Sequence, residues 1–257
     1  MQPGWQSVGS LGSGGRPVNL NAAGLAARLG RVLLPPSCLV CGAPGAGTRD
    51  LCRACTDELP WLEAACARCA LPLPVAAAAC GECLRTPPPF AGARAALRYA
   101  APVDRLLPHL KFHAGLAQGR LLAQLLLQAW PQWPDPVDLL LPLPLHRSRL
   151  GQRGYNQALE LARPLARAWQ RPLAPDALRR VRATAAQSEL DAAQRRRNVR
   201  GAFAADAALV AGRRVLLIDD VITTGATLRE AAATLLAAGA AEVRVLAAAR
   251  AAAPGRG

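Results

Sequence analysis

The sequence of 257 residues contains a single lysine, Lys111. Nucleotide-binding proteins with a P-loop need the pattern GxxxxGK followed by Ser or Thr, whose lysine contacts the phosphates. Lys111 lies in the unrelated context LKFHAG, so the sequence excludes this class of protein. The segment GSLGSGG near the amino terminus has the glycines of a dinucleotide-binding loop, but no strand pattern precedes it and no helical pattern begins in it. It therefore does not indicate a dinucleotide site.

Long apolar segments are also missing. Hydrophobic residues make up 52% of the chain and are largely alanine and leucine, yet no uninterrupted apolar run approaches the roughly 18 residues of a transmembrane helix. Residues 1–20 are rich in glycine and serine and lack the basic start and apolar core of a secretory signal. We therefore expect a disordered tail at residues 1–20, no transmembrane segment, and a cytoplasmic protein.

Aromatic and acidic residues are scarce. Only 4% of the residues are aromatic. The chain has 17 Asp and Glu but 31 Lys and Arg, which gives a formal net charge of +14. All but one of the basic residues are arginine. Such a charge suits phosphate-bearing ligands and nucleic acid, whereas few aromatic residues leave little room for base stacking.

The eight cysteines form four CxxC pairs, and successive pairs are 14 residues apart. Four thiolates in a tetrahedron suit Zn²⁺, so eight cysteines predict two sites. We expect these sites to be structural, because so short a segment buries too little surface to fold without metal. Disulfides are the alternative, which a reducing cytoplasm disfavours. Sequential pairing closes the shorter loops, but interleaved pairing stays open for Cys38, Cys41, Cys52, Cys55, Cys66, Cys69, Cys80 and Cys83.

The stretch VLLIDDVITTGAT, residues 215–227, combines an apolar run, two adjacent carboxylates and a loop of small hydroxylated residues. The run predicts a strand buried in a parallel sheet, with Asp219 and Asp220 at its carboxyl end, and a helix should start near Gly225. Ligands of open α/β sheets bind at this edge, and a helix N-terminus attracts anions. We therefore expect a sugar phosphate here; a buried strand followed by a polar turn is the alternative.

Strand and helix patterns alternate after the proline-rich segment TPPPF at residues 86–90. We expect strands at 94–99, 138–143, 178–181, 215–218 and 243–248, and helices at 22–34, 102–110, 116–130, 158–170 and after 225. LPLPLHRSRLGQRGYNQ and residues 182–200 are expected to be loops. Strands separated by helices favour a parallel sheet.

The stretch VLLIDDVITTGAT resembles the phosphoribosyl-diphosphate signature of type I phosphoribosyltransferases. Two further segments, DLLLPLPLHRSRLGQRGYNQALELA and RATAAQSELDAAQRRRNVRGAF, are similar to the ComF/GntX family. That resemblance extends over roughly residues 22–249 and implies a Rossmann-like parallel α/β sheet with a small amino-terminal double zinc ribbon. It divides the chain into a tail (1–20), a helix with the zinc ribbon (21–86), a phosphoribosyltransferase domain (87–250) and a tail (251–257). LKF at 110–112 resembles the family's LKF or LKY element but lacks the expected basic residue after it.

The resemblance also implies residue roles. Asp219 and Asp220 would hold the ribose hydroxyls, directly or through Mg²⁺ that accompanies phosphoribosyl diphosphate, and would stabilise the positive charge that develops at C1 as diphosphate leaves. Residues 182–200, with Arg182 as a catalytic candidate, would close over the substrate. The segment 145–153 would hold the diphosphate, although a solvated basic turn is the alternative. The candidate phosphate ligands are Thr223, Thr224, Gly225, Ala226, Thr227, Arg147 and Arg153.

Two classes of function follow from the sequence. One is a phosphoribosyltransferase with an unknown acceptor, implicated by its resemblance in natural competence, DNA uptake or DNA utilisation. The other is a noncatalytic adaptor or single-stranded DNA-binding protein that keeps the phosphoribosyl pocket and works with the DNA-uptake machinery. Arginines at 195, 196, 197 and 200 suit a track for nucleic acid as well as a catalytic loop.

Overall fold

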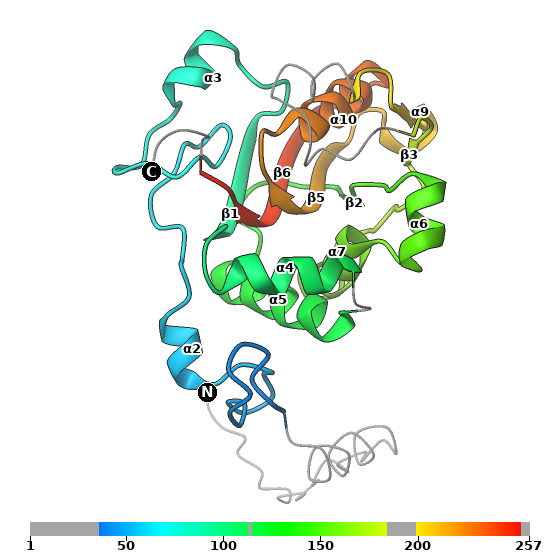
Figure 1. Ribbon diagram of the computed structural model, residues 1–257. Helices are drawn as coiled ribbons and strands as arrows, with labels where there is room; N and C mark the ends of the chain where they lie inside the picture. Colours follow the sequence, from blue (N-terminus) through cyan, green and yellow to red (C-terminus); the bar gives the residue numbers. More distant parts are fainter. Residues whose placement is uncertain (1–35, 113–114, 184–198, 253–257) are drawn as a thin grey trace, which may run out of the picture.

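A four-stranded parallel sheet forms the centre of the protein (Figure 1). The computed structural model describes residues 36–112, 115–183 and 199–252. The strand order is β1 (Gly92–Arg98), β6 (Glu242–Arg250), β5 (Arg214–Ile222) and β2 (Leu139–Pro142), and every pairing is parallel. The predicted parallel sheet is confirmed. The helix expected at 22–34 lies outside the described residues.

Helices cover both faces of the sheet. Figure 1 shows α4 (Val103–Phe112), α5 (Leu116–Ala129) and α7 (Gln157–Trp169) on one side and α10 (Ala226–Ala237) on the other. Successive residues of a strand point to opposite faces, so Leu216 and Ile218 of β5 pack with α4 and α5 while Val215 and Leu217 pack with α10. This is why β5 needs a continuous apolar run rather than an alternating one.

Two central strands are longer than the sequence predicts. β5 continues through both carboxylates to Ile222, and β6 continues to Arg250. The alanines at 247–249 of β6 stand opposite this part of β5 in the ladder, at Asp219 and Val221 among others. Pairing therefore carries on for two residues beyond Asp220, and the carboxylates lie near the end of the strand rather than at its final residue.

Residues expected to be loop contain a helix, α6 (Arg147–Arg153), so that prediction was wrong. The His146 side chain accepts a hydrogen bond from the Ser148 N–H at its start, and Gly154 closes it with φ 79°, a left-handed conformation that costs glycine little. The helix was missed because seven residues with no buried side chain give no amphipathic period.

A second, antiparallel pair of strands lies outside the main sheet. β3 (Leu178–Arg180) pairs with β4 (Phe203–Ala205), and the short helix α9 (Ala207–Val210) follows. The sequence predicted β3 but neither β4 nor α9. Of the expected loop at 182–200, residues 184–198 lie outside the part that the structure describes.

The cysteine-rich segment is built into the edge of the sheet. It contains the short helices α2 (Arg53–Asp57) and α3 (Gly81–Arg85). Its middle part runs along β1: the Leu62 N–H donates to the Ala96 carbonyl at 2.9 Å, and the Arg98 N–H donates to the Pro60 carbonyl at 2.8 Å. This contact covers β1, which would otherwise be an exposed edge strand.

The same segment shares a hydrophobic core with the helices. Cys38, Leu51 and Cys55 are buried in one cluster with side chains of α4 and α5. At the surface, Arg49 donates to Gln128 on α5 at 2.6 Å. Among the described helices, none is long and apolar enough to cross a membrane.

Candidate functional site

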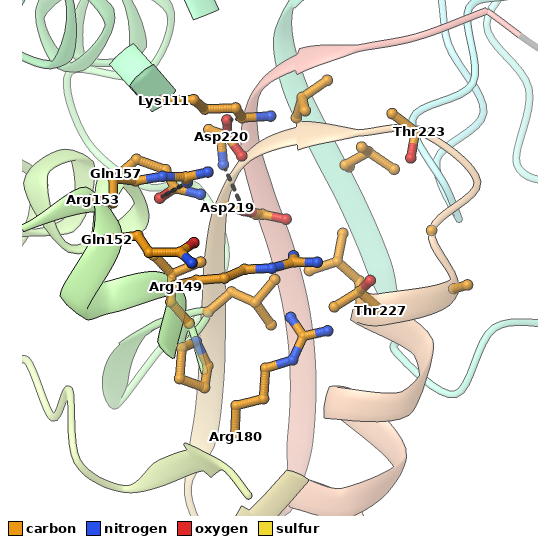
Figure 2. A pocket seen from close by; sticks show the side chains of 18 residues that line it. Lys111, Arg149, Gln152, Arg153, Gln157, Arg180, Asp219, Asp220, Thr223 and Thr227 are labelled. Atoms are coloured by element: carbon orange, nitrogen blue, oxygen red, sulfur yellow. Dashed lines mark hydrogen bonds and ion pairs between the residues drawn. The ribbon is translucent and has the colours of Figure 1, made fainter. Parts of the chain in front are cut away.

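A pocket of about 570 Å³ opens at the carboxyl end of the sheet, between α6 and the loop that joins β5 to α10 (Figure 2). One wall carries carboxylates from β5, another carries arginines from α6 and β3, and the third is the start of α10. Its polar lining residues include Lys111, Arg149, Gln152, Arg153, Gln157, Arg180, Asp219, Asp220, Thr223 and Thr227. The structure therefore brings together residues that are more than 100 positions apart.

The two adjacent carboxylates both line this pocket. Asp220 is only 2% exposed, and its backbone N–H donates to Asp219 Oδ1 at 2.9 Å. Burial raises the pKa of the Asp219 carboxyl well above its ordinary value, and the charge of Asp220 raises it further. Ionising both carboxyl groups is therefore unfavourable without a nearby cation or hydroxyl groups that donate to them.

Lys111, the only lysine, pairs with this dyad. Its Nζ lies 2.9 Å from Asp220 Oδ2. Burial by itself would lower the pKa of the ammonium group, but the charges of Asp220 and then Asp219 leave it above its ordinary value. The sequence left the role of Lys111 open; its position in the LKF element was the available signal.

The loop after β5 has the geometry of an anion site. Gly225 has φ 74° and is the N-cap of α10, and the first N–H groups of a helix lack acceptors within the helix. Thr223, Gly225, Ala226 and Thr227 line the pocket. Thr224 does not; its hydroxyl accepts a long hydrogen bond of 3.4 Å from the Ala226 N–H and so supports the turn.

Three arginines face the carboxylates across the pocket. Arg149 and Arg153 come from α6, and Arg180 comes from β3. Burial lowers the pKa of Arg153, which the charge of Asp220 partly offsets, and its Nη1 donates to Gln157 Oε1 at 2.7 Å. Together they make the wall opposite Asp219 strongly positive.

Arg180 was not identified from the sequence. It is 9% exposed, its guanidinium lies 5.5 Å from the centre of the Phe203 ring, and burial followed by the charge of Arg149 lowers its pKa to about 10. In β3, Leu178 and Arg180 are buried and Arg179 is exposed, and the sequence LRR carries no signal that would tell the two arginines apart.

Two candidates from the sequence stand elsewhere. Arg147 is exposed at the start of α6 and does not line the pocket. Arg182 is exposed as well, and its side chain donates to the Arg200 carbonyl. Neither residue lines the pocket with the carboxylates; Arg149 and Arg153 of the expected diphosphate segment do, together with Arg180.

The cysteines gather into two sets of four, in sequential order. Within each set, Cys38, Cys41, Cys52 and Cys55 or Cys66, Cys69, Cys80 and Cys83, the ligand atoms lie within 4.8 Å of one another. A Zn–S distance of about 2.3 Å places neighbouring sulfurs of a tetrahedral site about 3.8 Å apart, and both Cys41–Cys52 and Cys69–Cys80 have Sγ atoms 3.7 Å apart. The thiols therefore fit Zn²⁺, and all eight are free of disulfides.

Comparison with known proteins agrees with this geometry. The Double zinc ribbon domain family model matches residues 29–84, and the Phosphoribosyl transferase domain model matches residues 156–255. Fold, pocket and cysteine clusters define the class: a phosphoribosyltransferase-type α/β protein with an amino-terminal double zinc ribbon. DNA utilization protein YhgH of Escherichia coli is 38% identical over 167 residues, which cover 63% of this chain and 73% of that protein. The chain belongs to the ComF/GntX family.

Two further similarities complete the comparison. Competence protein F of Haemophilus influenzae is 37% identical over 160 residues, 60% of this chain and 70% of that protein. A solved glutamine phosphoribosylpyrophosphate amidotransferase from B. subtilis has 23% identity and a TM-score of 0.36, with coverage of 55% of this chain and 30% of that one.

Proposed function

We propose that this protein binds phosphoribosyl diphosphate in the pocket at the end of β5 and transfers the phosphoribosyl group to an acceptor. The observation that carries this proposal is the placement of an acidic dyad and the start of α10 in one pocket. A pentose phosphate has a vicinal diol and a phosphate at opposite ends, so these two features suit its two ends. The arginines opposite suit the diphosphate.

Each wall would have a separate task in the transfer. Asp219 and Asp220 would accept hydrogen bonds from the ribose hydroxyls and stabilise positive charge at C1 as its bond to diphosphate breaks. Thr223, Thr227 and the first N–H groups of α10 would hold the 5-phosphate. Arg149 and Arg180 would hold the departing diphosphate, whose negative charge increases as it leaves.

Carboxylate oxygens are also ligands that Mg²⁺ prefers. Because Lys111 lies against Asp220 Oδ2, Asp219 is the better placed of the two to hold a metal ion that arrives with phosphoribosyl diphosphate. Such an ion would neutralise charge on the diphosphate. We therefore propose Mg²⁺ as the companion of the substrate, with Lys111 as a cation that stays with the protein.

Transfer can be tested without knowing the acceptor. The protein is incubated with phosphoribosyl diphosphate, Mg²⁺ and fractions of a metabolite extract; we expect diphosphate release that depends on one fraction, together with a new phosphoribosyl adduct by mass spectrometry. Arg180→Met should reduce release at least tenfold while Arg147→Met, the exposed arginine outside the pocket, should leave it unchanged. Binding of phosphoribosyl diphosphate with no release in any fraction would point instead to a noncatalytic sensor or adaptor.

A role in handling DNA is the second proposal. It is supported by the names of the relatives, DNA utilization protein and Competence protein F, and by the net charge of +14. Binding through phosphate contacts alone is weak and falls steeply with salt, and 4% aromatic residues add little stacking.

This second proposal has its own measurement, fluorescence anisotropy with single-stranded DNA at several salt concentrations. The arginine run 195–197 lies outside the described residues, so the expectation rests on its charge. Changing Arg195, Arg196 and Arg197 together to alanine should weaken binding and flatten its dependence on log salt, by up to about 0.7 in slope for each phosphate that the protein no longer neutralises. A matched triple change of Arg53, Arg68 and Arg85 on the zinc ribbons should do neither. The reverse pattern would move the DNA-binding surface to the ribbons.

A further inference from the structure

Arg250, the last residue of β6, holds the loop that forms the phosphate end of the pocket. Its Nη1 donates to the carbonyls of Ile222 at 3.1 Å, of Ala251 at 2.7 Å, and of Thr223. The C=O and N–H of a peptide unit lie in one plane and point in opposite directions. By fixing the carbonyls of Ile222 and Thr223, Arg250 therefore also fixes where the next two N–H groups of the loop point.

The same side chain reaches the second cysteine cluster. Arg250 Nε donates to the Cys69 carbonyl at 3.0 Å, across 181 residues of sequence. Cys69 belongs to the cluster with Cys66, Cys80 and Cys83. One guanidinium group thus joins the backbone of a metal-ligand turn to the backbone of the β5–α10 loop.

That metal-ligand turn is itself anchored to the sheet. Ala70, directly after Cys69, is 1% exposed and packs in the core cluster that contains residues of β5 and α10. The Ala93 N–H at the start of β1 donates to the Ala67 carbonyl at 3.1 Å. The turn cannot move without disturbing either this core or Arg250.

Arg250 is a buried cation beside the second cluster. Arg250 is 6% exposed, and none of the ion pairs between described residues includes it. Four thiolates around one Zn²⁺ carry a net negative charge, which would compensate the charge of this guanidinium.

We propose that Arg250 is a positioning residue that couples the second cysteine cluster to the phosphate end of the pocket, so that the loop keeps its phosphate-binding shape only while that cluster holds metal. The proposal rests on the proposed function for the identity of the ligand but not for the coupling itself. The first cluster has no such connection to the loop among the described hydrogen bonds. Loss or oxidation of the second cluster alone would therefore weaken the pocket.

Hydrogen exchange of the β5–α10 loop tests the coupling without any ligand. Cys83→Ser, which removes a buried ligand of the second cluster, should raise exchange of the amides at 222–228 at least tenfold. Cys41→Ser, which removes an exposed ligand of the first cluster, should leave them unchanged. Equal exchange at 222–228 in both variants would overturn the proposal.

Arg250→Lys tests the side chain, because it keeps the charge but offers one nitrogen in place of a planar fork. Its matched control is Arg98→Lys, at the exposed register partner of Arg250 on β1. Arg250→Lys should raise loop exchange and weaken phosphoribosyl diphosphate binding at least tenfold in calorimetry, with zinc content still two per chain; Arg98→Lys should change neither. Wild-type loop exchange in Arg250→Lys would contradict the proposal.

Coupling between two sites is reciprocal. Saturating phosphoribosyl diphosphate should therefore slow alkylation of the second-cluster cysteines in the presence of a chelator, read cysteine by cysteine in mass spectrometry, and should not slow that of the first cluster. In Arg250→Lys this protection should disappear, and its persistence would refute the role of Arg250. If wild-type protein does not bind phosphoribosyl diphosphate but Cys83→Ser still loosens the loop, the proposed function fails and the coupling stands.

Discussion

Asp219→Asn combined with Asp220→Asn is expected to abolish binding of phosphoribosyl diphosphate while the protein stays folded. Each carboxylate would contribute a charge-assisted hydrogen bond of roughly 1.5–3 kcal/mol, so the pair should account for about 100-fold in affinity or more. Calorimetry with Mg²⁺ measures this loss. Unchanged affinity in a folded double variant would remove the central claim about the site.

The matched control is Asp138→Asn, at the opposite end of the same strand pair. Asp138 accepts hydrogen bonds from the Arg214 side chain at 2.7 and 2.9 Å at the start of β5, and Arg214 holds the pKa of this carboxyl well below its ordinary value. Asp138→Asn should cost some stability but leave affinity unchanged, because it lies away from the pocket. A similar loss of affinity in both variants would mean that the effect is structural.

The single variants should separate in stability. The raised pKa of Asp219 means that its ionised form is disfavoured in the folded state. The free energy of unfolding therefore falls as pH rises from the ordinary pKa of an aspartate to the raised pKa of Asp219. Asp219→Asn removes this loss and should be neutral or stabilising near pH 7 but not near pH 4. Asp220→Asn leaves Lys111 without its partner and should lower Tm by a few degrees, at about 2–4 °C per kcal/mol.

A large loss of stability on removal of zinc is the second large effect that we expect. Purified protein should contain two Zn²⁺ per chain by elemental analysis, and Cys41→Ser should lower the count to one. Apparent binding free energies in zinc-finger peptides reach about 10–16 kcal/mol, which exceeds the stability of most domains. One metal per wild-type chain, or eight thiols that titrate in the native protein, would refute the two clusters.

The consequences of chelation should spread further than the sequence suggests. The sequence predicts that chelation unfolds residues before Pro87 and leaves the later domain largely helical. In the structure, Cys38 and Cys55 pack with α4 and α5, and residues 60–62 bond to β1. We therefore expect circular dichroism to retain most of its helical signal while hydrogen exchange rises in β1, α4, α5 and the amides at 222–228 together with residues 36–86.

Local sequence patterns predicted the fold class and the part of the site that lies on β5 and the loop after it. The apolar run before Asp219 and the glycine at 225 predicted a buried strand and a helix start, because burial on two faces and a left-handed cap each demand particular residues. The CxxC spacing predicted two tetrahedral sites because two thiolates separated by two residues can reach one ion and four thiolates complete a Zn²⁺ site. α6 was missed, since its seven residues bury nothing and rely on two caps.

The rest of the site depends on contacts that no local pattern encodes. Lys111 meets Asp220 only because the end of α4 lies beside the end of β5, and Arg180 turns inward only because β3 pairs with β4. Arg250 meets Cys69 because β6 lies between β1 and β5. The order of the strands in the sheet was not predicted. This order decides which side chains lie next to one another at the carboxyl ends of the strands.

The sequence by itself thus determined the class of fold, the eight cysteines of the two clusters and the small-residue loop that leads into α10, because their periodicity and spacing are properties of short segments. Only the tertiary structure decided the sequential pairing of the cysteines, the cation beside the carboxylates, the arginines that face them and the link from the zinc ribbon to the loop. Apart from the cysteine pairing, these features join segments that are distant in the chain, and their energies come from burial and charge pairing that exist only once the sheet is assembled.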